Sequence, residues 1–230
     1  MRSSWLPLSL ITFFTVVVLL FFGLWLRSPL AVQEKKNIPA TMITNIEITS
    51  PTVTFLHPKK GATNPEITIV EFGDFLCSAC QSIQETLTAV LKTDPSVQLV
   101  WKYLPNEEED GMATKAAIAA ACAADQKKFW EYHDLLFERQ IYLGEEQIGQ
   151  IAEEIDLNKE VFENCYTSQE PLAFIRKDYE EGLSLQITAL PTLFIGQERF
   201  TGALSLGEIR SAIEQARARI HEEQTAQNPQ

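Results

Sequence analysis

The sequence predicts an α/β domain in which a block of helices interrupts a sheet, preceded by one N-terminal transmembrane helix. Three observations lead to this prediction. A strand–helix–strand pattern begins at the apolar, β-branched run Ile67–Phe72. Helical periodicity then dominates from about 107 to 186. The β pattern returns at Thr192–Ile195 and Arg199–Thr201, which a short Gly-containing turn separates. An uncharged apolar run at 5–26 supplies the membrane helix.

The globular domain is expected at 51–220, with a polar tail at 221–230. Its strands are expected at 53–56, 67–72, 97–103, 192–195 and 199–201, and a further edge strand could form at 43–49. Its helices are expected from the residues after Cys77 to Leu91 and at 113–124, 129–139, 145–155, 159–165, 172–183 and 206–219. The order strand, helix, strand is the start of a βαβ unit.

Residues 1–27 are predicted to be a transmembrane signal-anchor and 28–50 a tether. The run 5–26 matches the roughly 20 residues that cross a bilayer as a helix. It is longer than the usual signal-peptide core of about 7–15 residues, and no small-residue cleavage site follows. A cleaved signal peptide and a buried core helix are the alternatives.

The side of the membrane on which the domain lies is argued from chemistry. Arg27, Lys35 and Lys36 follow the run, so the positive-inside rule alone would place the domain in the cytoplasm. The cysteines suit an oxidising compartment instead. We therefore expect a single-pass inner-membrane protein with its folded domain on the extracytoplasmic, periplasmic side.

Composition excludes some classes of function. The formal net charge of −12 argues against a nucleic-acid binder, which needs clustered Lys and Arg to neutralise phosphates. The three histidines, His57, His133 and His221, are too scattered to build a metal site by themselves. No cofactor, no metal and a monomer are expected.

The motif Cys77-Ser78-Ala79-Cys80 carries the chemistry. Two cysteines at this spacing can be half of a zinc site, a redox pair or a coincidence, and zinc would want a second such pair. The motif follows a buried strand and opens a helix, whose N-terminal N–H groups and dipole stabilise a thiolate. Cys77 is then the expected nucleophile, and Cys80 the resolving cysteine one turn later.

Two further residues agree with a redox role. Glu71 lies within the apolar run before the motif, where a poorly solvated carboxyl would have a raised pKa and could move protons for Cys80. A hydrated, edge-facing Glu is the alternative. Pro191 begins a strand, and in cis it would bring the backbone of Leu190 up to Cys77, where an extended substrate could pair with it. An ordinary trans loop proline is the alternative.

Three segments of the chain resemble the DsbA-like branch of the thioredoxin superfamily, over roughly residues 51–215. They are 70–80 (VEFGDFLCSAC), 119–137 (AAACAADQKKFWEYHDLLF) and 190–195 (LPTLFI). The resemblance implies a thioredoxin-like fold with an inserted helical domain and a thiol–disulfide oxidoreductase activity.

The resemblance also implies roles for particular residues. Cys77, Cys80, Glu71 and Pro191 are the expected catalytic residues, with a groove and apolar surface around the motif for unfolded polypeptide. Leu190, Ser78 and Ala79 are the expected substrate-binding positions. The Ser-Ala pair replaces the Pro-His of strongly oxidising members, so less oxidising power is expected because Ala79 cannot help to hold a thiolate.

Cys122 and Cys165 lie in the helical block, either as buried free thiols or as a structural disulfide. His133 is expected to be a helix-surface or packed residue rather than a catalytic one. The aromatic cluster around it is expected in the core rather than in a binding site; its members are Phe129, Trp130, Tyr132 and Phe137.

The leading hypothesis is a disulfide-forming oxidase that acts on unfolded or partly folded secreted polypeptides. A membrane redox partner, either a quinone-linked oxidase or an electron carrier, would recycle it, and the lipid bilayer would hold residues 5–26. The alternatives are a dithiol reductase or isomerase of the same fold, and a non-catalytic assembly factor that binds thiols or metals.

Overall fold

The computed structural model describes residues 18–20, 49–106 and 111–227. The chain divides into two compact units, residues 1–46 and 47–230, and every element from β1 onward belongs to the second. Residues 18–20 are helical, while the rest of the predicted membrane helix 5–26 and most of the possible edge strand 43–49 lie outside the described residues. Among the helices that the structure describes, none is long and apolar enough to cross a bilayer.

A five-stranded sheet forms the centre of the domain, in the order β1-β3-β2-β4-β5. The strands are β1 Lys59–Gly61, β2 Ile67–Gly73, β3 Val97–Tyr103, β4 Thr192–Ile195 and β5 Glu198–Thr201. β2 and β3 run parallel, and the other neighbours are antiparallel. The central strand β2 is almost wholly buried, as its uninterrupted apolar run predicts.

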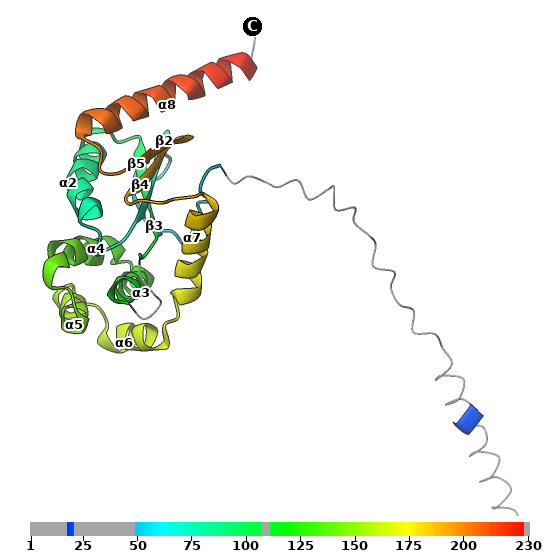
Figure 1. The fold of residues 1–230 in the computed structure, drawn as a ribbon, viewed down its shortest axis with the longest axis vertical. Helices are drawn as coiled ribbons and strands as arrows, with labels where there is room; N and C mark the ends of the chain where they lie inside the picture. The colour runs from blue at the N-terminus through cyan, green and yellow to red at the C-terminus, as the bar shows by residue number, and fades with distance from the viewer. Residues whose placement is uncertain (1–17, 21–48, 107–110, 228–230) are drawn as a thin grey trace, which may run out of the picture. The chain divides into compact units, whose positions relative to one another are not determined.

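Helices cover both faces of this sheet, and a group of further helices packs at one end of it. They are α2 Ser78–Thr93, α3 Met112–Asp125, α4 Phe129–Glu138, η2 Gln140–Tyr142 (a 3₁₀ turn), α5 Glu145–Glu154, α6 Lys159–Ser168, α7 Leu172–Ser184 and α8 Leu206–Gln227. Figure 1 shows α2 and α7 on opposite sides of the strands and α3 to α6 gathered together. The insertion between β3 and β4 is therefore helical, as predicted.

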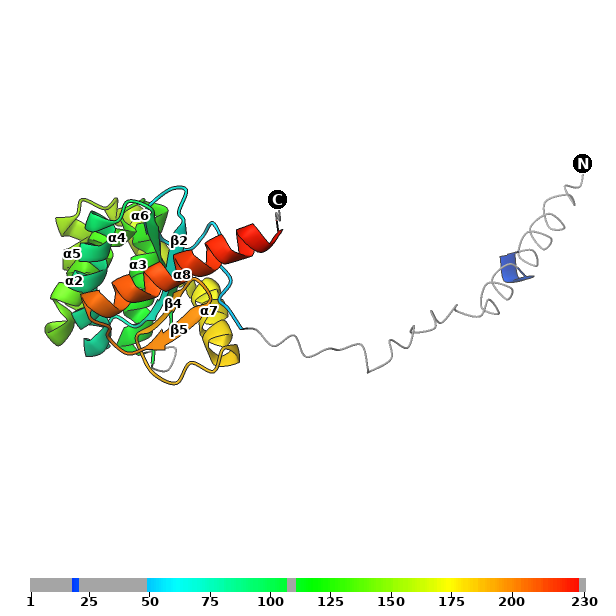
Figure 2. The same ribbon diagram turned by 90° about the horizontal axis from the view of Figure 1, so that it is seen from above.

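Side chains along each strand point alternately to the two faces of the sheet, so the two faces contribute to separate clusters of buried apolar residues. On one face of the sheet, Ile67 and Ile69 pack against Ile83 of α2 and Ile209 of α8. In Figure 2, α8 runs across the front of the strands. On the other face, Phe72 and its neighbours pack under the segment that follows α7. A third cluster fills the helical insertion and reaches the sheet through the side chains of β3.

Two predicted boundaries differ from the structure. The strand expected at 53–56 does not form; Phe55 is 89% exposed, and the first strand of the sheet is instead β1 at Lys59–Gly61, where no strand was expected. The imidazole Nδ1 of His57 accepts the N–H of Thr54 at 2.8 Å, which closes a turn where a strand would need that donor. The last helix continues past Arg219 to Gln227, since the polar residues there are compatible with an exposed helix.

Candidate active site

Cys77 and Cys80 lie at the N-terminus of α2, which follows β2 after a short loop at 74–76. Cys77 is the N-cap, with extended backbone angles (φ −81°, ψ 115°), and its Sγ accepts the N–H of Cys80 at 3.1 Å. Both cysteines are free thiols; Cys77 is partly exposed and Cys80 is buried. The sequence-predicted pair is therefore placed where one sulfur can meet a substrate and the other cannot.

The environment separates the two thiols in acidity. The hydrogen bond from the Cys80 thiol lowers the pKa of Cys77 from 9.0 to about 7, aided by backbone N–H groups and opposed by partial burial and the charge of Asp74. The same hydrogen bond, followed by burial, raises the pKa of Cys80 far above its usual range. Near neutral pH the thiolate is therefore the accessible sulfur, and the buried one keeps its proton.

Glu71 lies beneath the motif on the central strand. Its side chain is fully buried, and burial raises its pKa from 4.5 to about 8, although a hydrogen bond from Gln84 partly opposes this rise. The charges of Glu71 and Cys80 are coupled, since Glu71 is among the groups that raise the pKa of Cys80. The prediction of a buried carboxyl with a raised pKa is confirmed, while its role in moving protons stays a prediction.

The loop before β4 completes the site. The Leu190–Pro191 peptide bond is cis, the conformation expected from the sequence. A cleft of about 540 Å³ lies between this loop and α2, and Leu190, Cys77, Ser78 and Ala79 are among the residues that line it. The three predicted substrate-binding positions are thus brought together at one opening, although their contact with a substrate stays a prediction.

Two side chains that hold the loops of the site in place, those of Asp74 and Gln140, were not predicted from the sequence. Asp74 Oδ1 accepts the N–H of Leu76 at 2.8 Å, and its Oδ2 accepts that of Asn106 at 2.9 Å, so it ties together the loops after β2 and β3. Gln140 of η2 donates to the carbonyl of Cys77 at 3.0 Å. The position of Asp74, between a predicted strand and the Cys motif, could have indicated a role in holding the loop. No feature of the sequence near Gln140 indicates its contact with Cys77.

A buried cluster of charged side chains joins α7 to β3, and α7 lines the cleft on the side away from α2. Lys102 Nζ lies 2.9 Å from Asp178 Oδ1 and also pairs with Glu181. The Nδ1 of His57 is an acceptor for Thr54, so its Nε2 donates to Asp178 Oδ1 at 3.0 Å. Among the described residues, no group of His, Cys, Asp and Glu is arranged to hold a metal ion.

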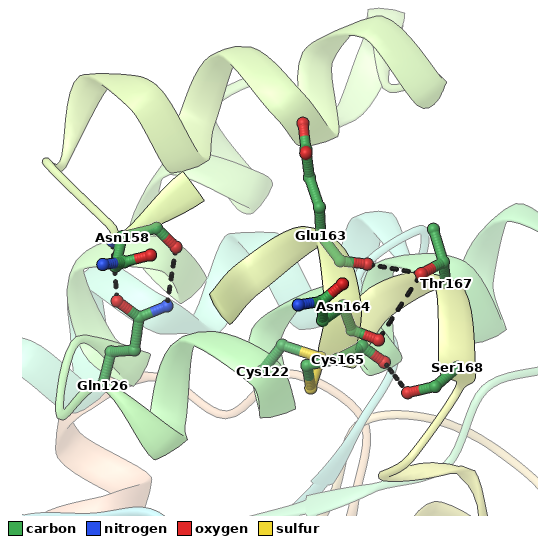
Figure 3. Close-up of a disulfide and its surroundings, with 8 residues drawn as sticks. All are labelled: Cys122, Gln126, Asn158, Glu163, Asn164, Cys165, Thr167 and Ser168. Atoms are coloured by element: carbon green, nitrogen blue, oxygen red, sulfur yellow. Dashed lines mark hydrogen bonds between the residues drawn. A yellow bond between two sulfur atoms is a disulfide. The ribbon is translucent and has the colours of Figure 1, made fainter. Parts of the chain in front are cut away.

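The other two cysteines form a disulfide within the helical insertion. Cys122 of α3 and Cys165 of α6 are bonded across 43 positions of sequence (Figure 3). The sequence was compatible with either two free thiols or a disulfide, and the structure has the disulfide. Neither cysteine lines the cleft beside Cys77. The disulfide therefore has a structural role: it joins α3 to α6 within the helical insertion.

Of the two positions expected for His133, helix surface or packed interior, the structure shows the second. Its ring is 1% exposed and lies edge-on to Trp101, with ring centroids 4.9 Å apart. Burial lowers its pKa, although a bond between its Nδ1 and Asp134 at 2.9 Å opposes this. Phe129 and Phe137 are buried beside it, so the aromatic cluster belongs to the core.

Fold and site together define the class of the protein: it is a thioredoxin-like domain with a helical insertion between β3 and β4 and a pair of free cysteines at the N-terminus of α2. The chain belongs to the thioredoxin family, since the family model described as "Thioredoxin" matches residues 57–215.

Curated relatives match the same region. A Na(+)/H(+) antiporter NhaA 3 of Salinispora tropica is 30% identical over 154 residues, 67% of this chain and 24% of the relative. The chain thus spans about a quarter of the length of that antiporter. A "Probable disulfide bond formation protein D" of Bacillus anthracis is 27% identical over 146 residues, 59% of this chain and 67% of the relative.

Solved structures share the fold. A thioredoxin-like oxidoreductase of Silicibacter pomeroyi superposes with a TM-score of 0.65 at 24% identity, covering 72% of this chain and 94% of that one. The thiol-disulfide exchange protein alpha-DsbA2 of Wolbachia pipientis has a TM-score of 0.64 at 21% identity, covering 70% and 87%.

Proposed function

We propose that the chain is a disulfide-forming oxidase that passes the Cys77–Cys80 disulfide to unfolded or partly folded polypeptides outside the cytoplasm. The observation that carries this proposal is the asymmetry of the two sulfurs. Cys77 is accessible at a helix N-terminus with a pKa lowered to about 7, so it leaves a mixed disulfide readily as a thiolate. Cys80 is buried and holds its proton.

The oxidase reaction has two exchange steps. A substrate thiolate attacks Sγ of Cys77, a substrate–Cys77 disulfide forms, and the Cys77–Cys80 bond breaks with its electron pair on Cys80. A second thiolate of the substrate then attacks the substrate sulfur of the mixed disulfide, and Cys77 leaves as a thiolate. The substrate loses two electrons and gains a disulfide, while the protein becomes a dithiol.

Glu71 supplies the proton for the first step. Cys80 would otherwise become a buried thiolate, which is costly in a low-dielectric interior. A carboxyl whose pKa is about 8 is mostly protonated near neutral pH, so it can give a proton to Cys80 as the disulfide opens. In the reverse direction, the ionised carboxyl takes that proton back.

Substrate contacts and cell compartment follow from the same features. The cleft beside Cys77 would take an extended segment of polypeptide, with the backbone of Leu190 as its pairing edge. The Cys122–Cys165 disulfide fits an oxidising compartment, and the apolar run 5–26 fits an anchor in the inner membrane with the domain on its outer, periplasmic side. A quinone-linked oxidase in that membrane is the proposed acceptor of the two electrons.

The deciding measurement is the reduction potential of the Cys77–Cys80 pair, with the full-length chain in detergent equilibrated in glutathione buffers. The oxidase predicts a value between about −120 and −180 mV. A value near about −270 mV would overturn it. Cys80→Ser is the control, because it can form only the mixed disulfide with glutathione and no internal bond.

Two features favour the alternative, a dithiol reductase. The charge of Asp74 opposes the thiolate of Cys77, and Ala79 has no side chain that could stabilise it. A less stable thiolate makes the disulfide harder to reduce and the dithiol a better donor of electrons. The same potential measurement separates the two directions.

A further inference from the structure

Gln84 connects the buried acid to the helix that carries the cysteines. It lies one turn after Cys80 on α2, and its Nε2 is 2.9 Å from Glu71 Oε1 and 2.9 Å from the carbonyl of Cys80. A backbone carbonyl can only accept, so the amide atom that faces both oxygens is the NH₂ group. Its two hydrogens therefore form a bridge from β2 to the active-site helix.

Gln84 is the hydrogen-bond donor that the described part of the chain supplies to this carboxyl. The second oxygen of Glu71, Oε2, has no hydrogen-bond partner among those residues. The strand neighbours of Glu71 are Trp101 and Leu193. The titratable groups that act on Glu71 are the cysteines of α2, since Cys77 raises its pKa and the charges of Cys80 and Glu71 are coupled.

We propose that Gln84 is a positioning residue for the redox reaction, which holds the Glu71 carboxyl beside Cys80 and favours the charged form that receives the Cys80 proton. This inference rests on the proposed thiol–disulfide exchange at Cys77. The hydrogen bonds of Gln84 go to the Glu71 carboxyl and to the backbone carbonyl of Cys80, so it acts through the carboxyl.

The step that it assists is the closing of the disulfide. In a mixed disulfide between Cys77 and glutathione, the Cys80 thiol gives its proton to the Glu71 carboxylate and its sulfur attacks Sγ of Cys77. The Cys77–Cys80 bond forms, the bond to glutathione breaks, and the electron pair leaves on glutathione thiolate. An N–H donor stabilises the carboxylate relative to the neutral acid, so Gln84 keeps the proton acceptor available at lower pH.

The first experiment measures the titration of Glu71 directly, by ¹³C NMR of glutamate carboxyls in the oxidised full-length chain in detergent. Gln84→Met keeps the length of the side chain but removes the donor, and we expect the midpoint to rise by about one pH unit. Gln84→Glu replaces the donor with a second carboxyl and is expected to raise it as well. Gln81→Met is the matched control, because Gln81 donates to the carbonyl of Phe137 and not to Glu71.

The second experiment measures how fast glutathione is released from the Cys77 mixed disulfide, as a function of pH. The rate should rise as Glu71 ionises, and Gln84→Met should be about tenfold slower at pH 7, in step with its shifted midpoint. In a Glu71→Gln background, Gln84→Met should have no further effect, because the group through which it acts is gone.

Two results would overturn the inference. One is a Glu71 midpoint that both Gln84 variants leave unchanged. The other is a loss of rate that Gln84→Met causes equally in the wild-type and the Glu71→Gln backgrounds, since that would be a structural effect on α2. The NMR midpoint does not depend on turnover, so a shifted midpoint in a chain that exchanges no disulfide with glutathione would reject the proposed function alone.

Discussion

Replacing Glu71 with Gln should change how the stability of the domain depends on pH. The carboxyl has a pKa of about 8 in the folded protein, against 4.5 for an exposed Glu, because it is fully buried. Between these two pH values the unfolded chain is ionised at this position while the folded one is still protonated. The folded state then binds more protons than the unfolded state, so stability falls as pH rises.

The size of the effect follows from the shift. Each unit of pKa is worth about 1.4 kcal/mol, so the wild type should lose about 5 kcal/mol between pH 4.5 and pH 8 through this group. Below pH 4.5 both states are protonated, and above pH 8 both are ionised, so no further change comes from it. Gln is neutral, has nearly the same shape and can still accept the hydrogen bond from Gln84. The free energy of unfolding of Glu71→Gln should therefore not show this decrease between pH 4.5 and pH 8.

The assay is urea unfolding of the full-length chain in detergent at several pH values, followed by far-UV circular dichroism. The protein is kept oxidised, so that neither Cys77 nor Cys80 titrates. The quantity of interest is the growth of the difference between Glu71→Gln and wild type with pH, since any fixed cost of the substitution cancels. Glu85→Gln, an exposed position on α2, controls for the loss of one negative charge. Parallel curves for Glu71→Gln and wild type from pH 4.5 to 8.5 would refute the reasoning.

Three further predictions concern other parts of the molecule. Replacing Cys122 and Cys165 together with Ala should lower the free energy of unfolding by about 4 kcal/mol, because the bond closes a loop across 43 positions; equal urea midpoints for variant and wild type would contradict this. Asp74→Asn should lower the pKa of Cys77 below about 7 by removing a nearby negative charge, seen as a lower midpoint of thiolate absorbance at 240 nm; an unchanged or higher midpoint would count against that charge effect. Lys102→Met should cost about 3–5 kcal/mol by removing the buried cation that pairs with the carboxylates of Asp178 and Glu181, which would then keep only hydrogen bonds. A loss below about 1 kcal/mol in urea would show that the pairing contributes little.

The sequence by itself determined most of the elements and the central chemistry of the site. The apolar, β-branched run Ile67–Phe72 predicted a buried strand, and the helical pattern after Cys77 predicted that the Cys pair opens the next helix, as the structure shows. Glu71 belongs to that apolar run, so its burial and raised pKa could be predicted too. These features depend on residues close together in the chain, where periodicity of two or 3.6 is a sufficient guide.

Tertiary structure decided the features that join distant segments. The pairing of Cys122 with Cys165 needed α3 and α6 to meet, and the contact of Gln140 with the carbonyl of Cys77 needed the helical insertion to fold back onto α2. The segment 53–56 alternates like a strand, yet the imidazole of His57 takes a backbone donor there and the segment turns instead. Local pattern specifies which face of an element is apolar, but which partner covers that face, and which polar groups then meet, depends on how the whole chain packs.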